Sequence, residues 1–261
     1  MDLKFGKKAP KFDKRTLKFA EIVVPTALPP IPDKYDIDDS VGLNVAGNMF
    51  GNDSWGDCVI AARANQQLRF ELYRHNKIIP VSTDDVLKEY WTEEDASGVK
   101  TCWLSKTFGK HPDEGLAMID SLKRWRKLGW VLNGNNYTIF AFASLDFKNK
   151  VEVKQATYLL QGIQVGIQLP QSAINQFNNG ESWYVSNENS QIIGGHAIYI
   201  VGYDEGGPVC LTWGKKQKIT WPFWEKYVDE AYATVDNKNL WIPDDPINVE
   251  LLNHYLNTIT S

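Results

Sequence analysis

Hydrophobic residues recur at helical spacing in the first half of the chain. Within residues 58–74 they return every three to four positions, at Ala61, Ala64, Leu68 and Leu72. This spacing places them on one face of a helix. Asp57 directly precedes the run, where an N-cap residue belongs, so we expect the helix to begin at Cys58.

Two further helices are predicted before residue 130. Residues 82–85 read Ser-Thr-Asp-Asp, which resembles a capping box and predicts a helix that runs through Tyr90. A third helix is expected after Pro112, over residues 113–128, and Gly129 is expected to end it.

The pattern changes after residue 150. One more helix is predicted over 152–161, and strands are predicted at 162–170, 196–204 and 209–213. Residues 221–235 are typical of a helix that finishes as a strand. Helices therefore dominate the first half and strands the second, which predicts the α+β class, with two lobes and a cleft between them.

The N-terminal region is basic and then rich in proline. Residues 1–20 carry seven Lys or Arg against two Asp, and four prolines follow by residue 32. We interpret the basic part as a solvated, partly ordered arm, and docking of the arm on an acidic partner or nucleic acid is the alternative.

These features divide the chain into three parts. We expect a basic and proline-rich extension over 1–30, a domain over 31–240 and a C-terminal extension over 241–261. Within the domain, a helical lobe is expected at about 55–130 and a β lobe at about 150–240.

Composition excludes several classes of function. The chain has 261 residues, a formal net charge of -4 and a pI near 5.6, so its overall charge does not suggest nucleic acid as a partner. No stretch approaches the roughly 18 apolar residues of a membrane span, and the charged N-terminus does not predict a signal peptide. We find no metal-binding or phosphate-binding motif and expect neither a metal nor a cofactor. The sequence does not indicate an oligomeric state.

The cysteines indicate the compartment. There are three, Cys58, Cys102 and Cys210, a small and odd number that argues against a disulfide framework. We therefore expect a cytoplasmic protein, although a Cys102–Cys210 bridge stays open.

Two residues are candidates for chemistry. A thiol in the first turn of a helix, as expected for Cys58, is stabilised as thiolate by the helix dipole. The alternative is a small buried apolar residue. Among the four histidines, His196 stands out because it follows Gly194 and Gly195 and leads an apolar strand. It is placed either to face a cleft or to lie in the core.

The two candidates are 138 residues apart, and papain-type enzymes separate nucleophile and histidine by roughly 130–150. At this point the chain resembles the papain-like cysteine peptidase superfamily. Five segments carry the resemblance in family order, namely residues 31–36, 52–58, 82–87, 194–203 and 213–214. The resemblance implies the papain-like two-lobed fold, with a helical lobe and an antiparallel β-sheet or barrel lobe.

The resemblance also implies the site. His196 would hold Cys58 as thiolate for attack on a carbonyl carbon, and would then protonate the leaving amine. The Cys58 amide and the side-chain amide of Asn52 would hold the oxyanion. The substrate cleft would be lined by Trp55, Gly56, Gly195 and Trp213, with Trp213 covering His196.

The sequence departs from the family pattern in three ways. The orienting asparagine falls at Leu211 or Thr212, depending on the alignment, and Thr212 could orient His196 only weakly through its hydroxyl. Trp55 replaces a cysteine that forms a family disulfide. The extension before residue 31 is shorter than the family's inhibitory propeptide, so control of that type is not expected.

Two functions follow from this pattern. The first is a cysteine peptidase-like hydrolase, acting by thiol acyl transfer on peptide or isopeptide bonds of a peptide or protein substrate. The alternative is a weak or inactive papain-like domain that binds peptide or protein, or serves as a structural module.

Overall fold

The computed structural model describes residues 3–40, 48–98, 113–186 and 190–236, together with 247, 250 and 252. The predictions made for Cys102, Pro112 and the C-terminal extension fall wholly or mostly outside these residues. In the described part, no helix is both long and apolar enough to cross a membrane.

The two best-marked helices begin where the sequence predicts. Helix α3 spans Cys58–His75, with Asp57 as its N-cap residue, but the Asp57 side chain makes no capping hydrogen bond. Helix α4 spans Thr83–Ala96 and opens with a capping box in which the Ser82 side chain accepts from the Asp85 amide. The amphipathic spacing therefore marks both starts locally, and at α4 the capping box adds to it.

The third predicted helix is shorter than expected. Helix α6 spans Met118–Lys127, so residues 113–117 are not helical. Leu116 instead pairs with the N-terminal segment, donating to Gly6 O at 2.7 Å and accepting from Lys8 N at 2.9 Å. These bonds take the backbone groups that an extra helical turn would need. Gly129, with φ +76°, follows the helix end as predicted.

Most of the strands form one sheet, which is eight-stranded within the described residues. Along the sheet the order is β1 (Leu17–Lys18), β5 (Ile139–Ser144), β10 (Val228–Asp236), β6 (Ile163–Pro170), β7 (Ile192–Asp204), β8 (Gly207–Thr212) and β9 (Lys215–Lys218), with β2 (Tyr35–Asp36) also paired to β7. The β1–β5 pair is parallel and the other pairs are antiparallel. Strands predicted at 162–170, 196–204 and 209–213 correspond to β6, β7 and β8.

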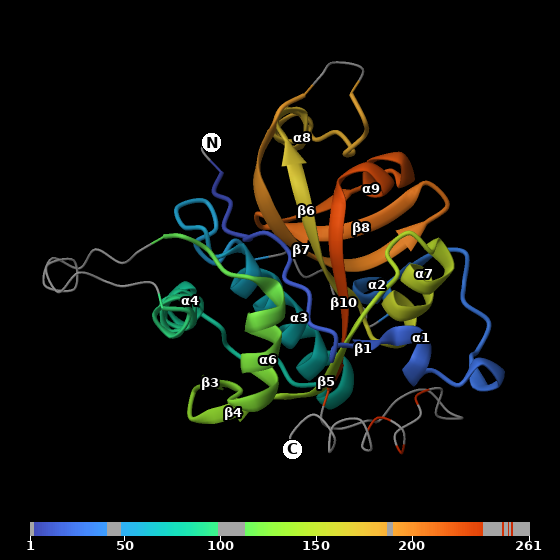
Figure 1. Ribbon diagram of the computed structural model, residues 1–261, viewed down its shortest axis with the longest axis horizontal. Helices are drawn as coiled ribbons and strands as arrows, with labels where there is room; N and C mark the ends of the chain where they lie inside the picture. The colour runs from blue at the N-terminus through green and yellow to red at the C-terminus, as the bar shows by residue number, and fades with distance from the viewer. Residues whose placement is uncertain are drawn as a thin grey trace, which may run out of the picture.

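The remaining elements cover or flank this sheet (Figure 1). They are α1 (Phe19–Ile22), the 3-10 turn η1 (Pro25–Ala27), α2 (Ile37–Ser40), the hairpin β3 (Trp130–Leu132) and β4 (Asn135–Tyr137), α7 (Lys150–Leu159), α8 (Gln171–Asn178) and α9 (Trp221–Tyr227). The predicted change from helix to strand within residues 221–235 is confirmed, because α9 runs directly into β10.

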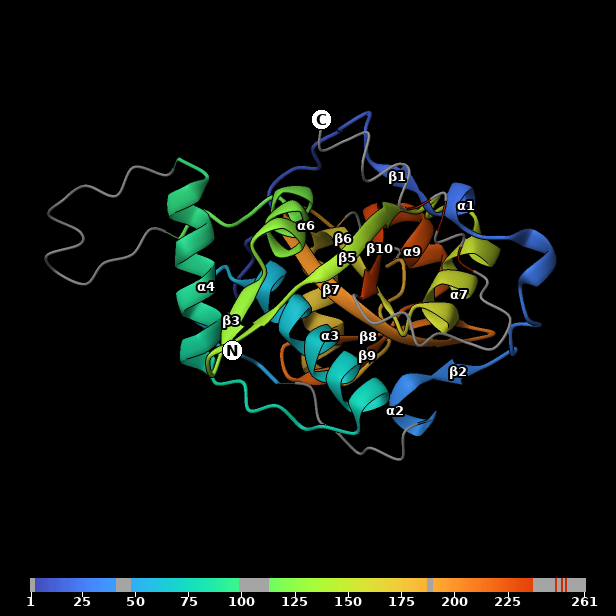
Figure 2. The same ribbon diagram turned by 90° about the horizontal axis from the view of Figure 1, so that it is seen from below.

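Two large hydrophobic clusters divide the molecule, as the α+β prediction requires. One fills the space between the sheet and helices α1, α7, α8 and α9. The other joins α3, α4 and α6 to the facing side of β7 and β10, through Ala197 and Tyr232. Figures 1 and 2 show α3 beside β7, where the helical and β parts meet.

The N-terminal region is a solvated arm only over residues 9–15, which are mostly exposed, and the expectation is wrong for the residues on either side. Leu3, Lys7, Leu17, Phe19 and Ile22 are all buried. The strand that begins at Leu17 pairs with β5, and the two buried residues of α1 join the core of the β lobe. Because these residues lie far from their partners in sequence, local charge patterns did not indicate the packing.

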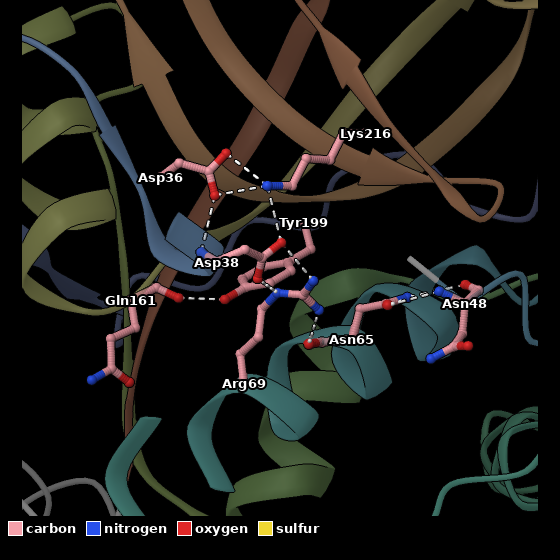
Figure 3. Close-up of polar contacts among 8 residues, drawn as sticks. All are labelled: Asp36, Asp38, Asn48, Asn65, Arg69, Gln161, Tyr199 and Lys216. Atoms are coloured by element: carbon pink, nitrogen blue, oxygen red, sulfur yellow. Dashed lines mark hydrogen bonds and ion pairs between the residues drawn. The ribbon is translucent and has the colours of Figure 1, made fainter. Parts of the chain in front are cut away.

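An ion cluster centred on the buried pair Arg69 and Asp38 joins segment 35–38 to both parts of the molecule (Figure 3). Arg69 on α3 donates to Asp38 through Nε at 2.8 Å and Nη2 at 3.0 Å, and both side chains are about 2% exposed or less. Lys216 on β9 reaches Asp36 at 2.8 Å and Asp38 at 3.1 Å. The Arg69 guanidinium also lies 5.9 Å from the ring centre of Tyr199 on β7. Segment 35–38 thereby links helix and sheet.

Candidate active site

Cys58 lies at the first turn of α3 and is 1% exposed. Its Sγ accepts a hydrogen bond of 3.4 Å from the amide of Ala197, the residue that follows His196 on β7. Burial raises the pKa of the Cys58 thiol to about 11, against the opposing effect of the Ala197 and Gly6 amides. The fold therefore brings the two predicted segments together, with the thiol held in its neutral form.

His196 lies on β7 and is fully buried. Its Nε2 lies 2.7 Å from Thr212 Oγ1 on the neighbouring strand β8. The Trp213 ring stacks on the imidazole, with centroids 4.2 Å apart and an interplanar angle of 15°. Burial is the main cause that lowers the pKa of His196, to about 3, and the Lys7 ammonium lowers it further.

The other ring nitrogen of His196, Nδ1, differs from Nε2 in its hydrogen bonding. Within the described residues, His196 Nδ1 makes no hydrogen bond, so the expected Cys58–His196 bond is not formed in this state. With a thiol pKa of about 11 and an imidazole pKa of about 3, both side chains are neutral near pH 7.

Of the two residues considered for the orienting position, the structure places Thr212 against the imidazole. Leu211 lies in the apolar cluster between α3 and the sheet. The alternation of side chains along β8 turns these neighbours to opposite faces.

Asn52 is buried near the start of α3. Its Nδ2 donates to the backbone oxygen of Trp55 at 3.0 Å. Asp57, between Trp55 and the helix, is fully buried, and this raises the pKa of its carboxyl to about 8, which the nearby Asn52 amide opposes in part. The Asn52 amide thus supports the loop before Cys58 in this state.

The N-terminal segment Leu3–Lys8 lies across these residues. Lys4 N donates to Asn52 O at 3.4 Å and Lys7 N donates to Gly195 O at 3.0 Å. The Phe5 ring meets the rings of His196 and Trp213 edge to face, at 6.2 and 6.1 Å. We refer to residues 3–8 as the N-terminal strap.

Two glycines let the strap approach closely. A Cβ on Gly6 would come within 1.5 Å of Gly56 O. A Cβ on Gly195 would come within 2.3 Å of Lys7 O. Both contacts leave room only for glycine. Gly56 N also donates to Asp113 Oδ1 at 2.7 Å, which holds the loop before Cys58 in place.

The predicted cleft residues therefore lie at different places around the thiol. Gly56 and Gly195 contact the strap, and Trp213 stacks on His196. Trp55 instead packs edge to face against Trp91 of α4, 5.4 Å away. The described residues hold no group of three or more His, Cys, Asp or Glu placed to bind a metal ion.

Comparison with solved structures shows the fold that carries this site. The chain is similar to xylellain, a cysteine protease from Xylella fastidiosa, with a TM-score of 0.69 and 15% identity over 91% of this chain and 97% of that one. The chain has a papain-like fold. The same fold is shared with a proCathepsin B from Trypanosoma congolense, at a TM-score of 0.62 and 11% identity over 90% and 87% of the two chains. It is also shared with a cysteine protease of Carica candamarcensis, at 0.54 and 11% over 80% and 100%.

Comparison of the sequence itself finds no relative of the chain. Neither protein-family models nor curated proteins give a match. At 11–15% identity the solved structures establish the fold alone, so the roles of Cys58 and His196 rest on their chemistry in this chain.

Sequence reasoning missed the strap. Its short pattern of hydrophobic residues and glycine has no helical or strand period. Its hydrogen-bond partners lie from 48 (Lys4 to Asn52) to 223 (Lys7 to Glu230) positions away in the sequence. The unusual signal was Gly6 between Phe5 and Lys7, a small residue that permits close backbone approach.

Proposed function

We propose that the chain is a cysteine peptidase-like hydrolase that cleaves peptide bonds by thiol acyl transfer, with Cys58 as nucleophile and His196 as acid and base. The observation that supports it best is the position of the Cys58 Sγ, at the start of an 18-residue helix and hydrogen-bonded to the residue beside His196. The helix N-terminus favours the thiolate once water reaches the site.

Thr212 supplies the orientation in this proposal. With Nε2–H donating to Thr212 Oγ1, the imidazole keeps its Nδ1 lone pair free to accept the Cys58 proton. The thiolate then adds to the carbonyl carbon, the C–N bond breaks, and the imidazolium gives its proton to the leaving amine. Water hydrolyses the resulting thioester and regenerates the thiol. The Cys58 amide, with Asn52 if its amide turns from Trp55, would hold the oxyanion.

The described arrangement is the covered state of this enzyme. The N-terminal strap excludes water, and both reacting groups are neutral beneath it. We propose that departure of the strap is the step that permits the ion pair, because hydration removes the penalty that burial places on the charged forms.

Peptide hydrolysis tests the proposal. The full chain carrying Gly6→Ala, which displaces the strap, is incubated with a peptide library and with an epoxysuccinyl probe. We expect cleavage and covalent labelling that Cys58→Ala abolishes and His196→Ala reduces strongly. Cys210→Ala is the matched control, because Cys210 is also a buried free thiol but lies on β8. Labelling of Cys58 no faster than Cys210, without cleavage, would reject the enzyme.

A peptide-binding domain without catalysis is the second candidate. One observation favours it: the Asn52 amide is engaged with the Trp55 carbonyl rather than left free for an oxyanion. This function predicts that a peptide matching residues 3–8 binds the Gly6→Ala chain equally well after Cys58→Ser. A thiolate that forms well below pH 7 in Gly6→Ala argues against it.

A further inference from the structure

The Lys7 side chain ends in a pocket next to the candidate active site. It is fully buried, and its Nζ lies 2.9 Å from Glu230 Oε1 and 3.1 Å from Asp229 Oδ2 on β10. Nζ also lies 3.0 Å from Asp229 Oδ1 and donates to Lys8 O at 3.2 Å. A lysine ammonium has three N–H donors, so each has an acceptor here.

The pocket leaves room for the unbranched methylene stem of a long side chain. A Cβ on Gly166 of β6 would come within 2.7 Å of the Lys7 Cδ and Cε and of the Glu230 Cγ. Glycine at this position therefore admits the methylene stem of Lys7. We refer to the space bounded by Gly166, Asp229 and Glu230 as the acidic pocket.

The acidic pocket is fixed in place by its neighbours. Gln168 Nε2 donates to Asp229, and Tyr232 donates to the second oxygen of Glu230 at 3.0 Å. Burial is the main cause that raises the pKa of Glu230, and the Lys7 ammonium opposes that rise. Glu230 is buried and Asp229 is half-buried, and two such neighbouring carboxylates repel one another unless a cation lies between them.

The pocket is also aligned with the reacting groups. The Lys7 backbone amide donates to Gly195 O, directly before His196, and the next residue of the strap toward the N-terminus, Gly6, lies against Gly56 beside Cys58. A peptide held by the Gly195 carbonyl would therefore place one side chain in the acidic pocket while its backbone passes Cys58.

We propose that the acidic pocket selects a lysine or arginine side chain of the peptide substrate, and that Lys7 occupies it as an internal stand-in. The inference deepens the proposed function, because it assigns the substrate class of the same site. Asp229 and Glu230 are its specificity-determining residues.

The first experiment uses the strap as the ligand of the pocket in the full chain. Residue 7 is changed to Arg, Met or Glu, and the rate of Cys58 alkylation by iodoacetamide reports how often the strap leaves. We expect Lys7→Arg to stay within a few-fold of the parent, and Lys7→Met and Lys7→Glu to react at least about tenfold faster. Methionine matches lysine in length without the charge.

The second experiment measures which residues surround the peptide bonds that the chain cleaves. The Lys7→Glu chain is given a peptide library, and the cleaved sites are compared with those of the same chain carrying Glu230→Gln. We expect Lys or Arg at one fixed position of the sites, lost in Glu230→Gln but retained in Glu225→Gln. Glu225 is the matched control, because it is an exposed carboxylate on α9.

The outcomes separate the two proposals. Alkylation of Lys7→Met as slow as the parent overturns the acidic pocket, as does cleavage without preference for a basic residue. Cys58 is alkylated slowly only in the chains with Lys or Arg at position 7 if the acidic pocket binds a basic side chain. If those chains behave in this way but no variant cleaves any peptide, the acidic pocket is supported and the hydrolase proposal is rejected. Restoration of slow alkylation in the double variant Lys7→Glu/Glu230→Lys would support direct charge pairing, independently of how well each single variant folds.

Discussion

The contact between Gly6 and the loop before Cys58 gives the sharpest prediction. A methyl group at position 6 would approach Gly56 O to 1.5 Å, whereas ordinary contact begins at 3.4 Å. The strap in Gly6→Ala would therefore have to move by about 2 Å, which is more than a hydrogen bond tolerates. We expect the strap to leave the site.

The size of the effect follows from what holds the strap. Three backbone hydrogen bonds of 3.0 Å or shorter would be lost, from Lys7 N to Gly195 O, from Leu116 N to Gly6 O, and from Lys8 N to Leu116 O, together with the longer bond of 3.4 Å from Lys4 N to Asn52 O. At about 0.5–1.5 kcal/mol each, the three shorter bonds contribute roughly 1.5–4.5 kcal/mol to the covered state. Since every 1.4 kcal/mol is tenfold, Cys58 alkylation should accelerate by roughly 10- to 10³-fold. The Lys7 ion pairs can only increase this value.

The assay is the second-order rate of iodoacetamide reaction at Cys58, read by mass spectrometry of the full chain at neutral pH. Lys4→Ala is the matched control, because Lys4 lies on the same strap and is exposed. Its rate should equal that of the parent chain. A Gly6→Ala rate within about twofold of the parent, in a chain with unchanged circular dichroism, would refute the covered state.

Three further predictions follow from the site and the core. Thr212→Val leaves the His196 ring without its 2.7 Å partner, and should lower the unfolding free energy in urea by about 1–3 kcal/mol and kcat by at least tenfold. Asp38→Ala leaves the Arg69 guanidinium buried without its carboxylate, and should cost about 3–5 kcal/mol in the same denaturation. Because burial raises the thiol pKa to about 11, alkylation of Cys58 in the parent chain should keep rising between pH 9 and pH 11.

The two substitutions have matched controls, and the pH dependence has a result that would contradict it. Thr212→Ser keeps the hydroxyl and should retain most of the stability and rate; equal losses in both variants would mean that the hydroxyl is not the cause. Asp120→Asn removes an exposed partner of Lys11 and should change stability by less than about 1 kcal/mol. A plateau of the alkylation rate near pH 7 would show that the thiol ionises readily beneath the strap.

The sequence predicted the parts of the site that depend on local pattern. The helix start at Cys58 and the strand that carries His196 follow from spacing, capping and glycine punctuation, and both are confirmed. The hairpin around Asn133 and Gly134 was overlooked, although Asn-Gly is a strong hairpin signal and both residues have positive φ.

The rest depended on contacts that no local pattern encodes. Residues 1–20 were interpreted as solvated because of their charge, yet the Lys7 ammonium is buried and donates to Glu230, which lies 223 positions later in the sequence. The engagement of the Asn52 amide likewise depends on the turn that brings the Trp55 carbonyl back toward it. Long-range partners of charged groups decide whether such groups are buried.

The pairing of β1 with β5 has a consequence for how the strap competes. It anchors the chain at Leu17, so residues 3–8 are tethered by only a short connection and experience an effective local concentration on the order of millimolar. A free peptide present at micromolar concentration would have to bind about 10³-fold more tightly than the strap to displace it at equilibrium. Short peptides would then be poor competitors of the strap. The thiol would be exposed more effectively by a partner protein that binds several surfaces of the molecule at once, or by proteolysis of the connecting residues 9–16.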